Sequence, residues 1–265
     1  MTGATLPLSD LVRYLDEYLQ IGAIPDDPSA LNGLQVDNSG VISRIVAAVD
    51  ASQATIDGLG GATGHPTGAL LLVHHGLFWD GKQPVTGRRY RRLRALFDHD
   101  AALYAAHIPL DLHPEVGNNV VLARALGLTD TTRFGDYKGT LIGIAGSLPP
   151  PAATRMQLVD RLAAILSLGS SAVRVLPGGP DRVHRIGVIT GAAGSAIAQA
   201  QAAGCDTFIS GEGAAHTYFD AIELGVNVLY AGHYATETLG VRALAKHLGE
   251  RFNLPWEFHD HPTGM

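Results

Sequence analysis

Two pairs of residues in this chain repeat one spacing, a histidine followed four positions later by an acid. They are His107 with Asp111, and His233 with Glu237. Side chains four residues apart lie on one face of a helix, so each pair can direct an imidazole and a carboxylate toward one point. An imidazole and a carboxylate placed in this way make half of a metal site.

His74 and His75 form a third group, directly after the apolar run 69–73 and before Gly76. Neighbouring residues of a strand point to opposite faces. The two imidazoles can therefore address two ions only where the strand ends and the backbone turns, as Gly76 permits.

The donor set consists of imidazoles and carboxylates without a thiolate, which suits divalent Zn, Fe, Mn, Co or Ni and does not select among them. The candidate donors are His74, His75, Asp111, His233 and Glu237. These are too few to fill two octahedral shells, so two ions would need bridging carboxylates and water. Paired ions about 3.5 to 4 Å apart can lower the pKa of a bridging water and hold both oxygens of a displacement, which is hydrolytic chemistry.

A single buried histidine is more often a hydrogen-bonded core residue than a ligand, but the joint occurrence of the three motifs favours the metal interpretation. We expect His107, His216 and Glu212 to orient the ligating imidazoles. In a hydrolase, Glu212 or His107 would also move protons.

Alternating strands and helices must position these residues. The segments 45–49, 69–73 and 101–106 are predicted strands of the first half, with a helix capped by 50–52 and a second helix at 88–99 between them. The second half repeats this β-α-β-α-β order with the segments 186–190, 191–203, 207–210, 217–224 and 226–231. Because open α/β sheets place ligands at the carboxyl ends of their strands, the candidate donors fall where a site is expected.

We therefore predict an α/β fold of two similar lobes, each a mostly parallel sheet flanked by helices. The first lobe is predicted at 1–130 and the second at 131–265, as an internal duplication without an inserted third domain. The metal site is expected in the cleft between the lobes.

Composition indicates a compact globular protein rather than a disordered chain, since 46% of the 265 residues are hydrophobic and 17% are charged. The net charge of −6 does not imply binding to nucleic acid. Cys205 is the only cysteine, so an intrachain disulfide is excluded. The N-terminus lacks the features of a signal peptide and no apolar run reaches the roughly 18 to 20 residues of a membrane span, so we expect a cytoplasmic, soluble protein.

Two further motifs each allow two interpretations. Five arginines lie between Arg88 and Arg94, and they form either a solvated helix face or subunit contact, or a patch that steers an anionic substrate. The glycine-rich segment 191–195 could hold a phosphate at a helix N-terminus, but it lacks the lysine and the glycine spacing of a P-loop. A plain strand-to-helix turn is favoured there.

Four motifs together resemble the Nif-three-like (NGG-interacting factor) dinuclear metal-centre family, whose members are often named GTP cyclohydrolase I type 2 homologues. The motifs are His74–Trp79, Leu110–Asn119, Ser210–Glu212 and Gly232–Glu237. The segment Gly33–Val36 is also similar to the N-terminal signature of that family, and the resemblance runs from about residue 9 to the end. The chain differs in its short linker between the lobes, which leaves no room for the domain inserted in longer relatives.

The resemblance implies metal ligation by five residues and a two-lobed subunit in a ring-shaped hexamer, a trimer of dimers. The implied ligands are His74, His75, Asp111, His233 and Glu237. The sequence contains no recognisable guanine-reading motif. Two functions are compatible with these expectations: a metal-dependent hydrolase of a small anionic substrate, either nucleotide-like or a phosphoester, and a metal-binding scaffold or regulatory protein in which the ions are structural.

Overall fold

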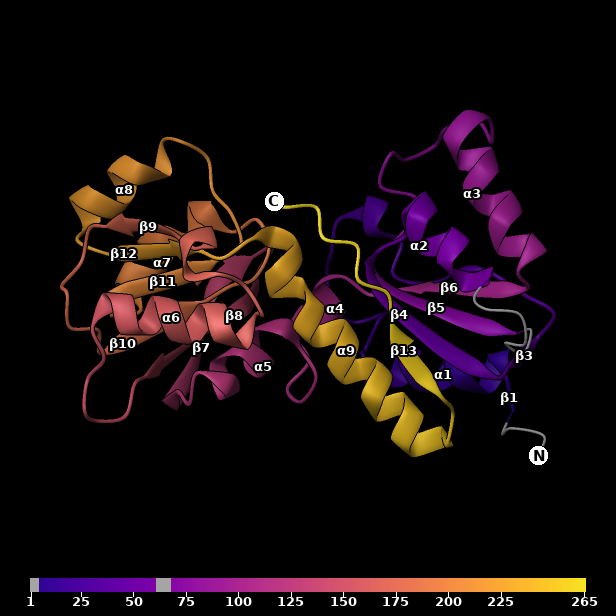
Figure 1. The fold of residues 1–265 in the computed structure, drawn as a ribbon, viewed down its shortest axis with the longest axis horizontal. Coiled ribbons are helices and arrows are strands. Elements are labelled where there is room, and N and C mark those ends of the chain that lie inside the picture. The colour runs from indigo at the N-terminus through magenta and orange to yellow at the C-terminus, as the bar shows by residue number, and fades with distance from the viewer. Residues whose placement is uncertain (1–4, 61–67) are drawn as a thin grey trace. The chain divides into compact units, whose positions relative to one another are not determined.

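The computed structural model describes residues 5–60 and 68–265, which fall into two compact units (Figure 1). Unit 1 comprises the described residues up to Leu110 together with Val241–His261, and unit 2 comprises Asp111–Gly240 with Pro262–Met265. This division differs from the expected boundary at residue 130. Before residue 130, Leu122 and Leu126 already pack in the core of unit 2, and the strand Trp256–Phe258 completes the sheet of unit 1.

Unit 1 is built on a five-stranded sheet of order β13-β4-β5-β6-β2. Its strands are β2 (Gly33–Val36), β4 (Arg44–Asp50), β5 (Ala69–His75), β6 (Ala101–Ala105) and β13 (Trp256–Phe258). Only β2 is antiparallel to its neighbour. The continuous apolar runs of β4, β5 and β6 are typical of parallel strands that are buried on both faces.

Helices cover both faces of this sheet. One face carries α2 (Gln53–Asp57) and α3 (Gly87–Asp98), whose Ile56 and Leu96 join the core with strand residues such as Leu71. On the other face lies α1 (Leu8–Tyr18), where Tyr104 of β6 donates a hydrogen bond to Asp16 Oδ1 at 2.7 Å. Unit 1 also contains the short strands β1 (Leu6–Pro7) and β3 (Val41–Ile42), two 3₁₀ turns, Pro28–Ala30 and Gly58–Gly60, and the start of α4 (Ile108–Asp111).

Unit 2 has a six-stranded sheet of order β7-β8-β10-β11-β12-β9. Its strands are β7 (Thr129–Tyr137), β8 (Thr140–Ser147), β9 (Arg174–Pro177), β10 (Arg185–Val188), β11 (Thr207–Ser210) and β12 (Asn227–Tyr230). The three strands β10, β11 and β12 are parallel, as expected, and the remaining pairs are antiparallel. The α/β class is thus confirmed, while the second sheet is mixed because a hairpin and β9 flank its parallel centre.

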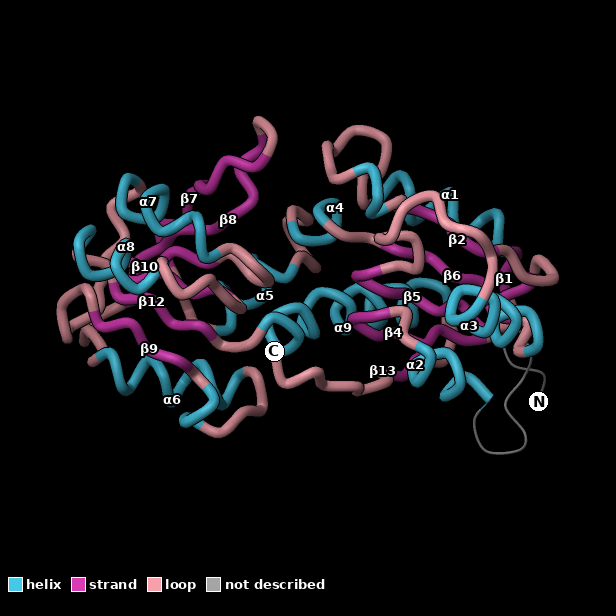
Figure 2. The backbone as a smooth tube through the Cα atoms, turned by 90° about the horizontal axis from the view of Figure 1, so that it is seen from above, coloured by secondary structure: helices cyan, strands magenta, loops and turns pink. Residues whose placement is uncertain are grey.

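The helices of unit 2 pack on opposite faces of its sheet (Figure 2). α5 (Asn118–Ala125) and α6 (Arg155–Ile165) share a core with Ile209 and Leu229, whereas α7 (Ile197–Ala202) and α8 (Thr217–Leu224) share a core with Phe208 and Val228. Adjacent strand residues therefore point to different helices, as the pleat of a strand requires. Short 3₁₀ turns at Ser170–Ala172 and Gly194–Ala196 complete the unit.

The last helix and strand explain why unit 1 includes the C-terminal segment. α9 (His233–Phe252) begins in unit 2 and ends in unit 1. After it, β13 pairs with β4 from Trp256 opposite Ile45 to Phe258 opposite Ala47. The guanidinium of Arg242 lies 3.6 Å from the ring centroid of Phe258 and fixes the strand against the helix. Over the described part of the chain, no helix is long and apolar enough to cross a membrane.

Candidate metal centre

Unit 1 brings three histidines together at the carboxyl ends of β5 and β6. His74 and His75 end β5, and His107 follows β6. The ring centroid of His74 lies 4.8 Å from that of His75 and 4.9 Å from that of His107. One nitrogen of each ring lies within 4.8 Å of the others, so the three can hold a metal ion. His74 and His75 are neighbours at the end of β5, and both belong to this group.

Each of these rings is held at its Nδ1 atom by an oxygen. The contacts are His74 Nδ1 with Ala106 O at 2.9 Å, His75 Nδ1 with Asp50 Oδ1 at 2.9 Å, and His107 Nδ1 with Asp26 Oδ1 at 3.0 Å. A carbonyl or a carboxylate only accepts, so a neutral ring donates from Nδ1 and keeps the lone pair on Nε2. This is the arrangement of metal-ligating histidines, whose second nitrogen is fixed by a hydrogen bond.

Asp50 reaches His75 because β4 and β5 run parallel and end in register, with Asp50 paired to His75. The sequence predicted that residues 50–52 cap the next helix. The cap is Ser52, whose Oγ accepts a hydrogen bond from Thr55 N at 3.1 Å, and Asp50 serves the histidine instead. The position of Asp50 at the end of a strand next to β5 therefore indicates its role better than its position before a helix does.

Asp26 is a site residue that the sequence did not reveal. Besides His107, it accepts hydrogen bonds from Ile108 N at 3.0 Å and from Asn32 Nδ2 at 2.8 Å, while Asn32 Oδ1 accepts from His107 N at 2.7 Å. Burial raises the pKa of Asp26, but the hydrogen bonds and charge of His107, with the bonds from Asn32 and Asp27 N, lower it to about 2. Its carboxylate is thus ionised when it orients His107.

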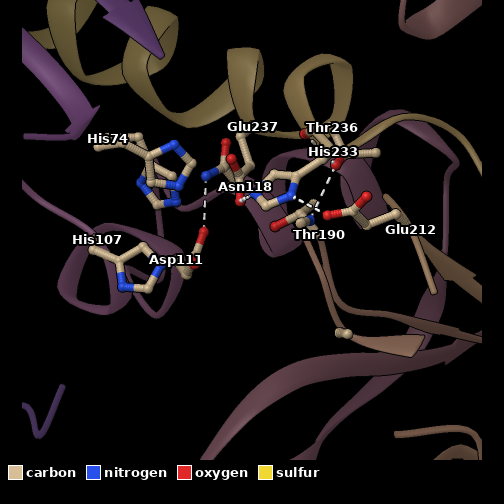
Figure 3. A network of polar contacts seen from close by, with 12 residues as sticks. His74, His107, Asp111, Asn118, Thr190, Glu212, His233, Thr236 and Glu237 are labelled. Carbon is tan, nitrogen blue, oxygen red and sulfur yellow. Dashed lines mark hydrogen bonds and ion pairs between the residues drawn. The ribbon is translucent and has the colours of Figure 1, made fainter. Parts of the chain in front are cut away.

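Unit 2 places His233 and Glu237 on the first turn of α9. His233 Nε2 lies 3.1 Å from Glu237 Oε1, which confirms that they share one helical face. His233 Nδ1 contacts Glu212 Oε1 at 2.8 Å (Figure 3). The hydrogen bond with Glu237 is the largest influence on His233, and with Glu212 it outweighs burial and raises the pKa of His233 to about 9.

The glycine-rich turn at 191–195 provides space for the pair. Gly191 has φ +70°, and a Cβ atom there would overlap Glu237 Oε1. A Cβ at Gly211 would lie 2.6 Å from the Cα of His233. The segment leads from β10 into the 3₁₀ turn Gly194–Ala196 and the six-residue helix α7, as a strand-to-helix turn does. Gly191 in this turn makes room for the donors of α9.

Asp111 is buried at the end of α4, and its Oδ1 accepts a hydrogen bond from Asn118 Nδ2 of α5 at 2.8 Å (Figure 3). Asn118 Oδ1 in turn accepts a hydrogen bond from Gly240 N of α9 at 2.6 Å. In contrast, His216 is exposed immediately before α8. Of His107, His216 and Glu212, the three residues expected to orient the ligating imidazoles, Glu212 is the one that contacts His233.

Together, unit 1 offers imidazole donors and unit 2 offers an imidazole and two carboxylates. This nitrogen and oxygen set fits Zn, Fe, Mn, Co or Ni. The donors are pre-oriented by hydrogen bonds, and buried residues such as Glu237, with 2% exposure, limit the access of water.

Comparisons with known proteins agree in covering nearly the whole chain. The family model described as Duf34/NIF3 (NGG1p interacting factor 3) matches residues 6–263. A Deinococcus radiodurans protein named GTP cyclohydrolase 1 type 2 homolog is 49% identical over 257 residues, covering 97% of this chain and 94% of that protein. A protein of the same name from Halobacterium salinarum is 43% identical over 264 residues, covering 98% and 100%.

Two solved structures share the fold along their full lengths. The crystal structure of TTHA1606 from Thermus thermophilus is similar with a TM-score of 0.84 at 43% identity, covering 98% of this chain and 100% of that one. The protein ybgI, described as of unknown function, has a TM-score of 0.84 at 35% identity with the same coverage.

Proposed function

Because this chain belongs to the Duf34/NIF3 family, we propose that it is a metal-dependent hydrolase with a dinuclear centre. The proposed ligands are His74, His75, Asp111, His233 and Glu237. The family resemblance inferred from the four motifs is confirmed by the match over residues 6–263. The centre would join the donors of both units, as the expected site between the lobes requires.

The observation that carries the proposal is the common restraint on four histidines. His74, His75 and His233 each contact an oxygen through Nδ1, and His107 does the same. A histidine that only fills the core can form its hydrogen bond through either ring nitrogen, so core histidines need not share the same bonded atom. Four rings with the same nitrogen restrained by an oxygen instead match the second-sphere pattern of metal sites.

When bound, the ions would supply a water of lowered pKa and would polarise the electrophile. His107 and Glu212 are the proposed proton carriers. Asp26 fixes Nδ1 of His107, which leaves Nε2 of that ring as the atom that takes or gives a proton. Glu212 is only partly buried and contacts His233 through one oxygen.

The proposed substrate is a small anion, either a nucleotide or a phosphoester. The relatives named GTP cyclohydrolase 1 type 2 homolog make guanine nucleotides the first candidates to test. We also propose that the chain is a homo-oligomer, with the ring-shaped hexamer implied by the family resemblance as the expected form.

A second candidate function is a scaffold or regulatory protein with structural ions. The burial of His74 and Glu237 favours it, because structural sites are closed whereas catalytic sites keep an open position. Glu237→Gln separates the two. A hydrolase should lose turnover while its assembly persists, whereas a structural centre should lose folding or assembly on this substitution or on chelation.

The metal content tests the centre without reference to a substrate. Elemental analysis should find close to two divalent ions per chain, and far fewer in a His74→Ala/His233→Ala variant. His184→Ala, at an exposed histidine, is the matched control and should retain the ions. An unchanged metal content in the double variant would remove the proposed centre. A screen of nucleotides and phosphoesters with each defined metal would then identify the substrate.

A further inference from the structure

The apolar face of α8 is the starting point of a further inference. Tyr218, Phe219 and Ile222 are all exposed, with Phe219 exposed by 63%, and the rings of Tyr218 and Phe219 pack edge to face at 5.6 Å. The buried side chains of the helix, Thr217 and Ala221, already anchor it to unit 2. A group of large apolar side chains on one exposed helix is typical of a contact surface.

This face is also acidic. Asp220 and Glu223 are exposed on α8 next to the apolar residues. Two copies of the same face meeting across a two-fold axis would bring these carboxylates together, which is unfavourable. The apolar residues therefore call for a partner surface that is apolar and positively charged.

Unit 1 carries such a surface on α3. The five arginines of this helix divide into a partly buried group, Arg89 and Arg92, and an exposed group. Arg89 is mostly buried and contacts Asp80, Gly81 O and Gln83 O. The exposed group, Arg88, Arg91 and Arg94, lies with the exposed aromatic rings Tyr90 and Phe97. Figure 1 shows α3 and α8 at the surface of their own units.

We infer that α8 of one copy docks on α3 of a second copy, with the acids of α8 facing the exposed arginines of α3 and the aromatic side chains between them. The contact is head-to-tail, because each chain contributes α8 to one neighbour and α3 to another. Such a contact builds rings when its rotation closes. The inference extends the self-association proposed above and does not depend on hydrolytic activity.

A second copy fits this surface better than a nucleic acid does. Arginines interleaved with aromatic rings also suit a polyanion, but the chain as a whole carries a net charge of −6. The complementary acidic and apolar face is present on the same chain, at the corresponding helix of the other β-α-β-α-β unit. Every copy therefore brings both halves of the contact.

Two charge-reversed variants of the full chain test the inference. One carries Arg88→Glu with Arg91→Glu on α3, and the other carries Asp220→Arg with Glu223→Arg on α8. Each alone should lower the assembled fraction at least tenfold at about 0.15 M salt, since its α3 and α8 then carry like charges. Light scattering and native mass spectrometry report the assembly, and circular dichroism verifies that each variant is folded.

Mixing the two variants is the decisive measurement. In the mixture, the reversed α3 of one variant matches the reversed α8 of the other, and the two unchanged helices also match. Assemblies containing equal numbers of both variants should therefore form, although neither variant assembles alone. Phe219→Ser should lower assembly without any rescue by mixing.

Three results would overturn the inference. They are a monomeric wild type, charge variants that assemble as well as the wild type, and variants that dissociate but are not restored by mixing. Retention of nucleic acid by the wild type, lost on Arg88→Glu/Arg91→Glu with no change in assembly, would assign α3 to a polyanion instead.

Discussion

Gly191 illustrates at the scale of one residue how backbone geometry makes room for a donor. Gly191→Ala should displace Glu237, because the new methyl group would overlap Glu237 Oε1, and the bound metal should fall by at least half. The substitution also strains the backbone at φ +70°, which costs about 1 to 2 kcal/mol. Elemental analysis and urea unfolding measure the two effects.

Gly225→Ala is a matched control for that experiment. Gly225 has φ +69°, but nothing lies within 4 Å of a Cβ atom placed there. It should show the same loss of stability and keep the metal. If both variants retain equal metal, the overlap of the new methyl group at position 191 with Glu237 Oε1 does not affect metal binding.

Asp26 allows a prediction about pH. Its pKa is 3.8 without interactions and about 2 in the folded chain, so the carboxylate stabilises the fold above pH 4 and this stabilisation is lost as the pH falls toward 2. Asp26→Asn should lower the free energy of unfolding by about 2 kcal/mol at pH 6. The difference from wild type should shrink between pH 4 and pH 2 in urea titrations. Asp57→Asn, at an exposed helix position, is the control, and an Asp26 effect that is independent of pH would contradict the prediction.

For single residues, the sequence predicts the candidate metal ligands better than it predicts the residues that orient them by hydrogen bonds. The contact predicted from the four-residue spacing of His233 and Glu237 is found, because both residues lie on one helix and local geometry decides their contact. Asp26 contacts His107 across 81 positions, from a loop without periodicity. Such contacts depend on tertiary structure, and local pattern contains no information about them.

Among the elements, the buried parallel strands are predictable from their apolar runs. β11 (Thr207–Ser210) and α8 (Thr217–Leu224) lie where the sequence places them. β7 and β13 do not appear in the predicted elements. β7 is rich in exposed polar residues, and β13 has only three residues, so neither shows an apolar run or a clear alternation.

Removal of β13 tests its contribution to unit 1. A chain ending at residue 254 should lose the hydrogen bonds of Ile45 N to Pro255 O and of His259 N to Ala47 O, and it should expose the edge of β4. An open, apolar strand edge promotes aggregation, so we expect a lower melting temperature and increased light scattering. A chain ending at residue 261 keeps β13 and should behave nearly as the wild type. Equal stability of the two truncated chains would show that β13 is dispensable.

For the whole molecule, the proposed centre predicts that metal couples the unfolding of the two units. Ions held by donors from both units stabilise only the state in which both are folded. Calorimetry of the metal-loaded chain should give one transition, and the chelated chain or a His75→Ala/Glu237→Ala variant should give two at lower temperature. At metal concentrations about 1,000 times the dissociation constant, the gain is about 4 kcal/mol. Two transitions in the loaded wild type would argue against shared ions.

The division of the chain into units also sets an order of events at the ribosome. Unit 2 occupies Asp111–Gly240, between two segments of unit 1. During synthesis, almost all of unit 2 has emerged before the strand that completes the first sheet is translated, and domains generally fold as they emerge. Unit 1 begins first, but its sheet is completed only after nearly all of unit 2 has been synthesised. Until Phe258 leaves the exit tunnel, the nascent chain carries an uncovered edge on β4, which is the stage at which a chaperone would be needed.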